Sequence, residues 1–152
     1  MKQPKTQNAF LLELLDEAYD LPAWHGPNLR NSLRGVTARQ AAWRPRPGRH
    51  NIWEVAVHAA YWKYAVRRRL LGGKRGSFAL KGSNWFERPD SATEEEWRAD
   101  LALLEEEHRK LRETVAGLPA AAKTRLIYGI AFHDVYHAGQ IQVLKRLCPI
   151  AP

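Results

Sequence analysis

The chain has 152 residues, of which 45% are hydrophobic, and a formal net charge of +8 at pH 7. That hydrophobic content excludes a disordered chain, and the length suits a single domain spanning residues 1–152 with a sizeable core. The single cysteine, Cys148, excludes an internal disulfide framework and agrees with a reducing compartment. No stretch approaches the roughly 18 apolar residues of a membrane span, and the N-terminus lacks the apolar core of a signal peptide. We therefore expect a soluble, cytoplasmic protein whose charge suits acidic or anionic partners.

The first third of the chain predicts one long helix and two short ones. Residues 8–21 place their apolar side chains on one helical face, and the pattern ends at a proline. A short helical segment is expected around residues 28–33. Thr37 then opens another, since a glutamine follows it three residues later as in a capping box. The proline-rich stretch 44–48 predicts a loop.

A second long helix is predicted to begin after Asn51, a good N-cap with Glu54 at the third helical position. His58 lies within the apolar stripe of this helix. A pair of glycines ends it, and the long connection 72–92 follows, with three aromatic residues embedded in a sequence rich in glycine and basic residues. Loops of this length are uncommon in compact domains, so this one is either a functional edge or a flexible crossover.

The last two helices are predicted to begin at Thr93, which opens a capping box, and at Thr124, which we expect to be the N-cap. Their apolar residues recur in steps of three and four, as in a helical bundle. His108 lies on the first of these stripes, and His133 and His137 lie on the second. Four long amphipathic helices without alternating strand patterns predict an all-α antiparallel four-helix bundle with long crossover connections.

His133 and His137 are four residues apart, so a helix places them on one face with Cβ atoms roughly 6 Å apart. A single histidine on an apolar stripe is most often a hydrogen-bonded core residue. Two adjacent imidazoles in a core both lose solvation and both need partners, and one metal ion satisfies the two together. The spacing therefore makes metal binding about as well supported as a purely structural role.

A third ligand is required, and the pattern offers two: His58 and His108 both lie on inward stripes of other helices. His58 and His133 are at similar depths in their helices, which would make them level if those helices ran parallel, and not if they ran antiparallel. Spacing alone leaves this choice open. His25 and His50 lie in irregular segments and are expected at the surface or at a rim.

Three neutral imidazoles without a thiolate or carboxylate would leave an open coordination position, as in catalytic metal sites. Zinc and nickel both suit imidazole ligands. Asp134 invites comparison with the His-Glu-x-x-His helix of zinc peptidases, but aspartate is one methylene shorter and no third ligand follows in the usual pattern. We expect Asp134 to face solvent or to orient an imidazole from behind.

The nine residues from His133 to Ile141, HDVYHAGQI, resemble the signature of the DinB/YfiT-like metalloenzymes, a bundle family distinct from the DNA polymerase of the same name. Upstream motifs follow in the family's usual order: Trp24-His25-Gly26-Pro27, Arg44-Pro45, Pro47-Gly48, and Ile52-Trp53-Glu54 followed by His58. The resemblance covers about residues 8–148. It implies a bundle with a crossover and a divalent metal held by His58, His133 and His137, and so prefers His58 over His108.

Members of this family with known activity resemble thiol S-transferases that use bacillithiol, mycothiol or related low-molecular-weight thiols. From this resemblance we expect a metal-dependent thiol transferase that acts in detoxification or stress response. The resemblance also implies a homodimer. Asp134 and Tyr136 are then candidate catalytic residues, and Gln140 and Arg49 are candidates for binding a thiol cofactor. Thiols that carry carboxylates would suit the positive charge of the chain, with Arg44, Arg46, Arg49 and Lys74 as candidate contacts.

Two other functions remain open. A non-catalytic bundle could hold the metal for stability or sensing in a stress response. A nonspecific nucleic-acid binder could use the run Arg67–Arg69. No nucleic-acid-reading motif accompanies that run, which is more simply the solvated last turn of a helix, where cations are favourable.

Overall fold

The computed structural model describes residues 6–74, 76–88, 93–119 and 122–150. Within these ranges the regular structure consists of helices, with one isolated bridge between Ser83 and Trp85 in the long connection. The helices are α1 (Gln7–Tyr19), α2 (Leu29–Leu33), α3 (Ala38–Ala42), α4 (Ile52–Leu70), α5 (Glu94–Gly117) and α6 (Thr124–Leu147). The all-α prediction is confirmed.

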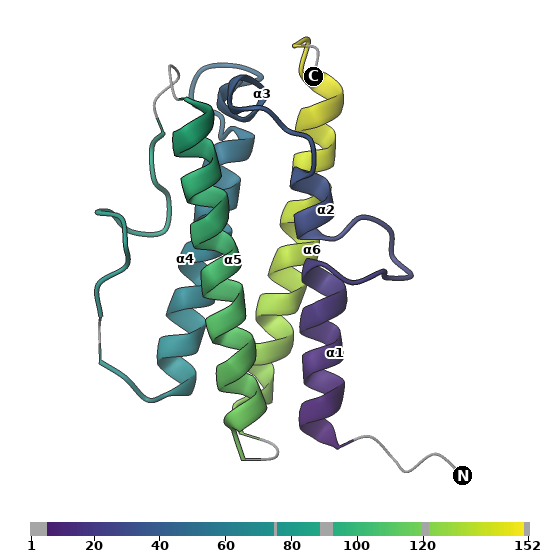
Figure 1. Ribbon diagram of the computed structural model, residues 1–152, viewed down its shortest axis with the longest axis vertical. Helices are drawn as coiled ribbons and strands as arrows, with labels where there is room; N and C mark the ends of the chain where they lie inside the picture. The colour runs from purple at the N-terminus through teal and green to yellow at the C-terminus, as the bar shows by residue number, and fades with distance from the viewer. Residues whose placement is uncertain (1–5, 75, 89–92, 120–121, 151–152) are drawn as a thin grey trace.

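The four long helices α1, α4, α5 and α6 lie side by side as a bundle (Figure 1). Helices α1 and α6 run in one direction, and α4 and α5 run in the other. The connection between α4 and α5 therefore returns along the length of the bundle, as Figure 1 shows for the teal segment. The short helix α3 lies near one end of the bundle, and α2 lies beyond the end of α1, against α6. This is the predicted bundle with a crossover, in which neighbouring α4 and α5 are parallel.

Side-chain caps define where three of these helices begin. The side chains of Thr37, Asn51 and Thr93 each accept a hydrogen bond from the backbone N–H three residues on, and the side chain at that position accepts one from the backbone N–H of the cap residue. These capping boxes are confirmed. The prediction for Thr124 is wrong, because α6 begins at Thr124 itself and the preceding Lys123 has a left-handed backbone with φ 49° and no side-chain cap. The Lys123 side chain instead donates to the last carbonyls of α4.

The core consists of two apolar clusters along the bundle axis. One cluster contains Trp53, Trp97 and the first half of α4, and the other contains Leu15, Leu111 and the second half of α4. Buried polar side chains occupy the helix positions between the two clusters: His58, Lys63, His108, Asp134 and His137. The fold therefore places a polar layer near the middle of an apolar core.

Helices α4 and α6 are antiparallel, yet His58 and His133 meet across them. His58 and His133 each lie about two turns from the N-terminus of their own helix. In antiparallel helices, residues at the same distance from their N-termini lie side by side only if the helix ends are offset along the bundle axis. The ends are offset, since α6 is five residues longer than α4 and its C-terminal end extends past the start of α4 (Figure 1). Pairing by helix depth was therefore an insufficient guide, because it ignored the relative shift of the two helices.

Candidate metal centre

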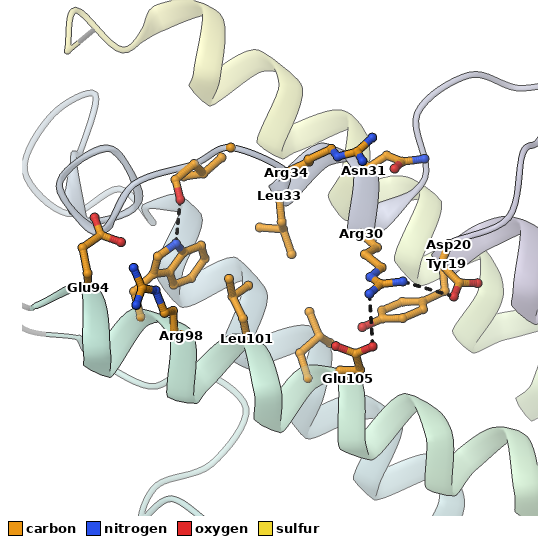
Figure 2. Close-up of a pocket in the computed structure, with 14 residues that line it drawn as sticks. Tyr19, Asp20, Arg30, Asn31, Leu33, Arg34, Glu94, Arg98, Leu101 and Glu105 are labelled. Carbon is orange, nitrogen blue, oxygen red and sulfur yellow. Dashed lines mark hydrogen bonds and ion pairs between the residues drawn. The ribbon is translucent and has the colours of Figure 1, made fainter. Parts of the chain in front are cut away.

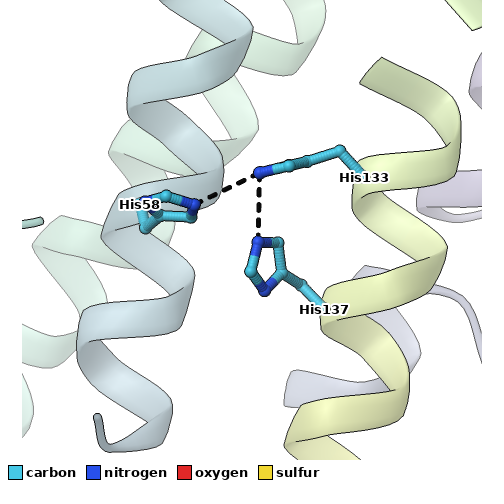
Figure 3. A group of neighbouring side chains, drawn as sticks. All are labelled: His58, His133 and His137. Carbon is cyan, nitrogen blue, oxygen red and sulfur yellow. Dashed lines mark hydrogen bonds between the residues drawn. The ribbon is translucent and has the colours of Figure 1, made fainter. Parts of the chain in front are cut away.

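His58 from α4 and His133 and His137 from α6 direct their imidazole rings at one point (Figure 3). The Nε2 atom of His133 lies 3.2 Å from Nε2 of His58 and 3.0 Å from Nε2 of His137. All three candidate ligand atoms lie within 4.8 Å of one another. The structure thus brings together three histidines positioned to hold a metal ion, and we call them the histidine triad.

Hydrogen bonds behind two of the rings determine which nitrogen faces the centre. His58 Nδ1 lies 2.7 Å from the backbone carbonyl oxygen of Asn84, and His137 Nδ1 lies 2.6 Å from Oε1 of Gln140. Because both neighbours are acceptors, each Nδ1 carries the proton of a neutral ring. The Nε2 lone pairs of both rings therefore point into the triad. This arrangement of outer acceptors is the one that orients metal-ligating histidines.

Coordination of a metal ion would satisfy the three nitrogens of the triad better than hydrogen bonds among them. Two lone pairs face His133 Nε2, which can offer at most one proton, so hydrogen bonding satisfies only one of the two contacts. Zinc–nitrogen distances of about 2.0–2.1 Å in a tetrahedral site place ligand nitrogens about 3.3–3.4 Å apart, close to the 3.0 and 3.2 Å found here. One divalent cation would accept all three lone pairs at once.

Burial keeps the three rings neutral, which ligation requires. It lowers the pKa of His133 to about 3, with further contributions from His137 and His58, and lowers the pKa of His137 to about 4. The pKa of His58 is also lowered by burial, although its hydrogen bond to Asn84 opposes the shift. His133 Nδ1 is buried without a hydrogen-bond partner among the described residues. Its ring is therefore the least constrained of the three.

The long connection between α4 and α5 forms one wall of the site. Trp85 is stacked between two imidazoles, with its ring 3.8 Å from that of His58 and 3.6 Å from that of His50. Asn84 precedes it with a left-handed φ of 65°, and its side-chain oxygen accepts a hydrogen bond of 2.8 Å from the Trp62 indole. This part of the connection is therefore packed against the triad through His58. Sequence reasoning missed Asn84, although asparagine is one of the few residues that tolerates this backbone conformation.

Asp134 faces the protein core and not solvent. Its side chain is completely buried and forms an ion pair with Lys63 of α4, which is also completely buried. Lys63 Nζ in turn lies 3.3 Å from Nδ1 of His108, whose ring stacks on Tyr19 at 3.7 Å. The prediction that Asp134 could face solvent is wrong, because the turn that aims His133 at α4 carries the next residue into the core.

His108 is not a member of the triad. Its imidazole belongs to the buried layer with Lys63, and burial together with that cation lowers its pKa to about 2. His25 and His50 are exposed, as expected of residues in irregular segments. His50 nevertheless contributes to the site, because it covers the outer face of Trp85 and its Nδ1 lies 2.9 Å from Glu54.

A cavity of about 720 Å³, which we call the basic cavity, is lined by none of the three histidines but by Trp85 and Gln140, which contact His58 and His137. Its lining includes Arg46, Arg49, Trp85, Tyr136 and Gln140. Three of the four candidate catalytic and cofactor-binding residues therefore gather in one space, and only Asp134 is elsewhere. The Gln140 amide connects the cavity to the triad, since it accepts from His137 and donates to the Tyr136 hydroxyl at 3.0 Å.

Arg44, unlike Arg46 and Arg49, does not line the basic cavity. Its guanidinium forms two bonds to the carboxylate of Glu54, at 2.9 and 2.5 Å, and a third to the carbonyl of Arg49. The hydrogen bonds from Arg44, and the one to His50, hold the pKa of Glu54 below its usual value against the effect of burial. This arginine therefore fixes the start of α4, whereas Arg46 and Arg49 line the cavity.

A separate cavity of about 550 Å³ lies between α2 and α5, and none of the triad lines it (Figure 2). Figure 2 shows Arg30 between Asp20 and Glu105, with nitrogen–oxygen distances of 3.8 and 3.2 Å. These pairs neutralise the charge of Arg30 within the protein. The cavity contains no second cluster of metal-ligating groups among the described residues.

The arginine run at the end of α4 is also partly engaged. Arg67 pairs with Glu107 at 3.3 Å, and Arg69 lies over the Trp62 ring. Arg68 donates to the carbonyl of Lys74. These contacts leave less free positive charge for nucleic acid than the sequence suggested.

Among the described residues, none of the helices combines the length and apolar character that a bilayer span requires.

The fold and the triad define an all-helical bundle with a candidate tri-histidine metal centre between two antiparallel helices. Comparison with protein families gives a match to the DinB superfamily over residues 23–141, which includes all three histidines. The chain belongs to the DinB superfamily. Neither the comparison with curated proteins nor that with solved structures gave a significant match.

Proposed function

We propose that this protein is a divalent-metal-dependent thiol S-transferase, which conjugates a low-molecular-weight thiol to an electrophile in detoxification or stress response. The observation that carries the proposal is the histidine triad, a three-nitrogen set without a thiolate or carboxylate, beside the basic cavity. Three ligands leave a coordination position for an exchangeable group, as in catalytic zinc sites. His58, His133 and His137 are the proposed ligands of zinc or nickel.

A divalent cation in the triad supplies Lewis acidity, which lowers the pKa of a coordinated thiol and makes thiolate available at neutral pH. The protein's own residues bind and orient the thiol. Arg46 and Arg49 line the basic cavity, where guanidinium groups can pair with carboxylates of the thiol compound. Trp85 covers one face of His58, which excludes water from that side of the site.

Gln140 is proposed to act as a positioning residue. Its Oε1 accepts the Nδ1 proton of His137, and its amide nitrogen donates to Tyr136. The hydroxyl of Tyr136 is thereby left as a donor toward the cavity, because its acceptor lone pair is used by Gln140. Tyr136 is 63% exposed, so its side chain is accessible to a bound ligand. Asp134 has no such access and is not proposed to act on substrate.

The test is a conjugation assay with metal-loaded protein, each of several thiols (bacillithiol, mycothiol and coenzyme A) and monobromobimane. Fluorescent conjugate should form faster than without protein, with one thiol preferred, and the excess rate should disappear in His137→Ala. His108→Gln is the matched control, because it changes a buried imidazole outside the triad. No metal-dependent conjugation with any thiol overturns the proposal. Metal-dependent thermal stabilisation without turnover would then favour the non-catalytic metal-binding bundle.

A further inference from the structure

A second cavity borders the triad at His133, and we call it the apolar cavity. It has a volume of about 390 Å³ and is lined chiefly by Trp62, Val66, Leu126, Gly129, Ile130 and His133. Its volume falls within the range of small-molecule sites. His133 lines this cavity and not the basic cavity. Of the two cavities, only the apolar one is therefore lined by a histidine of the triad, and the basic cavity is connected to the triad through Gln140.

The cations at the edge of the apolar cavity do not make it an anion site. Lys123 is held by the C-terminus of α4, where its Nζ donates to the carbonyls of Arg69 at 2.5 Å and Leu70 at 3.2 Å. Arg125 is exposed and lies at the mouth. The remaining wall is aliphatic or aromatic, apart from the imidazole of His133. Such a wall favours a ligand with an apolar body.

Each cavity is lined by one glycine of α6. Gly129 lines the apolar cavity and Gly139 lines the basic cavity, and both lie inside α6, where glycine is among the least favourable residues. Neither has a left-handed backbone. A Cβ atom added at either position would meet no heavy atom within 4 Å. Backbone conformation and packing therefore do not require glycine at these positions, whereas a side chain there would extend into the cavity.

We propose that the apolar cavity binds the electrophilic substrate, a small and largely apolar organic halide, while the thiol occupies the basic cavity. The inference rests on the proposed transferase function and assigns its two substrates to separate cavities, one lined by His133 and the other by Gln140, which contacts His137. In the reaction, the thiol sulfur forms a bond to the electrophilic carbon, and the carbon–halogen bond breaks with its electron pair leaving on the halide. The thiol proton passes to solvent.

This division follows from the chemistry of the two spaces. The thiol compounds are polar and anionic, and the basic cavity offers Arg46, Arg49 and the Gln140 amide. The electrophile needs desolvation and a position near the triad, and the apolar cavity offers both beside His133. Separate entry also means that the two substrates do not compete for one space.

Direct binding can be measured without metal, thiol or turnover. Fluorobenzene, an unreactive apolar probe, is titrated into ¹⁵N-labelled protein while amide and indole signals are followed by NMR. The backbone amide of Gly129 and the indole N–H of Trp62 should shift in a saturable way, and the amide of Gly139 reports on the other cavity. Shifts confined to Gly139, or no saturable shift up to the solubility limit, overturn the inference.

Leucine substitutions then separate the two cavities in the conjugation assay. Gly129→Leu should raise KM for monobromobimane at least tenfold and leave KM for the thiol within twofold, while Gly139→Leu should do the reverse. Gly117→Leu is the matched control, because Gly117 ends α5, lines neither cavity and also has open space around its Cβ position. Gly129→Ala adds one methyl group to the same helix position and tests whether helix propensity alone alters the kinetics.

The outcomes distinguish this inference from the proposed function. Conjugation by the wild-type protein with an unchanged bromobimane KM in Gly129→Leu overturns the cavity assignment and leaves the transferase proposal standing. Saturable fluorobenzene shifts at Gly129 without conjugation by any thiol overturn the transferase proposal, and the apolar cavity then remains as a binding site for apolar molecules only.

Discussion

Lys63 and Asp134 form an ion pair in which both side chains are completely buried, directly beside the candidate metal centre in sequence. Burial lowers the pKa of Lys63 and raises that of Asp134, and each charge opposes the shift in the other. The second carboxylate oxygen, Oδ1, has no hydrogen-bond partner among the described residues. The pair connects α4 to α6 at the level where His58 and His133 must meet, so it helps to set the register of the two helices.

We expect Asp134→Leu to destabilise the protein by about 3–5 kcal/mol, because the buried ammonium of Lys63 loses its partner. The double variant Lys63→Met/Asp134→Leu should recover most of that loss, since an apolar pair needs no charge compensation. Urea unfolding followed by circular dichroism measures both. A single variant within about 1 kcal/mol of the wild type would show that the pair is not formed as described.

Metal removal and addition test the triad directly. Protein purified without chelator or affinity tag should contain zinc or nickel in proportion to the chain, and added metal should raise the melting temperature. His58→Ala should lower metal affinity by at least about 100-fold, because two imidazoles rarely hold a metal tightly. Elemental analysis and competition with a chelating dye measure these effects.

His108→Gln is the control for that experiment. It tests the alternative third ligand and should leave metal content unchanged, since His108 contacts Lys63 and Tyr19 instead. Loss of metal in His108→Gln together with retention in His58→Ala would contradict the assignment of ligands.

The metal-free protein should lose stability as pH falls below about 6.5, the ordinary pKa of histidine. The pKa of His108 is lowered to about 2, that of His133 to about 3 and that of His137 to about 4 in the folded state. The unfolded chain therefore binds more protons than the folded one between those values and 6.5, so unfolding becomes easier as pH decreases. Each such histidine contributes up to about 1.4 kcal/mol per pH unit.

Melting temperatures measured between pH 8 and pH 4.5 test this dependence. His108→Gln should show a shallower decline than the wild type, because it removes one of the groups that gains a proton on unfolding. An equally steep decline in the variant would contradict the role given to His108. Saturating metal should shift the decline to lower pH, since ligation competes with protonation.

Asn84 positions His58 through its backbone and anchors the connection through its side chain. Asn84→Ala keeps the carbonyl that accepts from His58 but loses the bond from Trp62 and places alanine at a left-handed φ of 65°. We expect metal affinity to fall about 10–100-fold, the usual effect of disturbing groups behind metal ligands. Asn84→Gly removes the same side chain without the backbone strain, so its affinity should lie between those of alanine variant and wild type. Equal affinity in all three proteins would contradict the role of the connection.

Homodimerisation, implied by the family resemblance, stays a prediction. Helix α6 exposes Phe132 and Leu147, each more than half accessible, on the outside of the bundle and away from both cavities. Burial of this surface in a dimer would remove large apolar area from water. We expect light scattering after size exclusion to give a dimer for the wild type and a monomer for Phe132→Glu. A monomeric wild type at micromolar concentration would contradict the prediction.

Much of the site could be predicted because helical periodicity relates sequence spacing to direction. His133 and His137 share a face by their spacing alone, and His58 lies on an inward stripe of α4 for the same reason. The choice between His58 and His108 depended on how far α6 is shifted along α4, a quantity set by packing of the two helices. The family resemblance supplied that choice, and the structure places His58 in the triad.

Other parts of the site have no periodic signal. The carbonyl of Asn84 and the stacked ring of Trp85 come from a connection without regular structure, whose path depends on contacts with α4 and His50. Asp134 was expected to face solvent or to orient an imidazole, whereas α6 is enclosed on more than one side and carries this residue to Lys63.

By itself, then, the sequence determined four amphipathic helices, three of their capping boxes and the pair of histidines on α6, because these are local properties of spacing and residue type. Only the tertiary structure decided how His58, which the family resemblance had preferred, meets His133 and His137, that Lys63 neutralises Asp134, and that a cavity opens beside His133. The contacts of His58 with His133 and of Lys63 with Asp134 join residues 75 and 71 positions apart in the chain. They are set by the offset and packing of whole helices, and local periodicity carries no information about either.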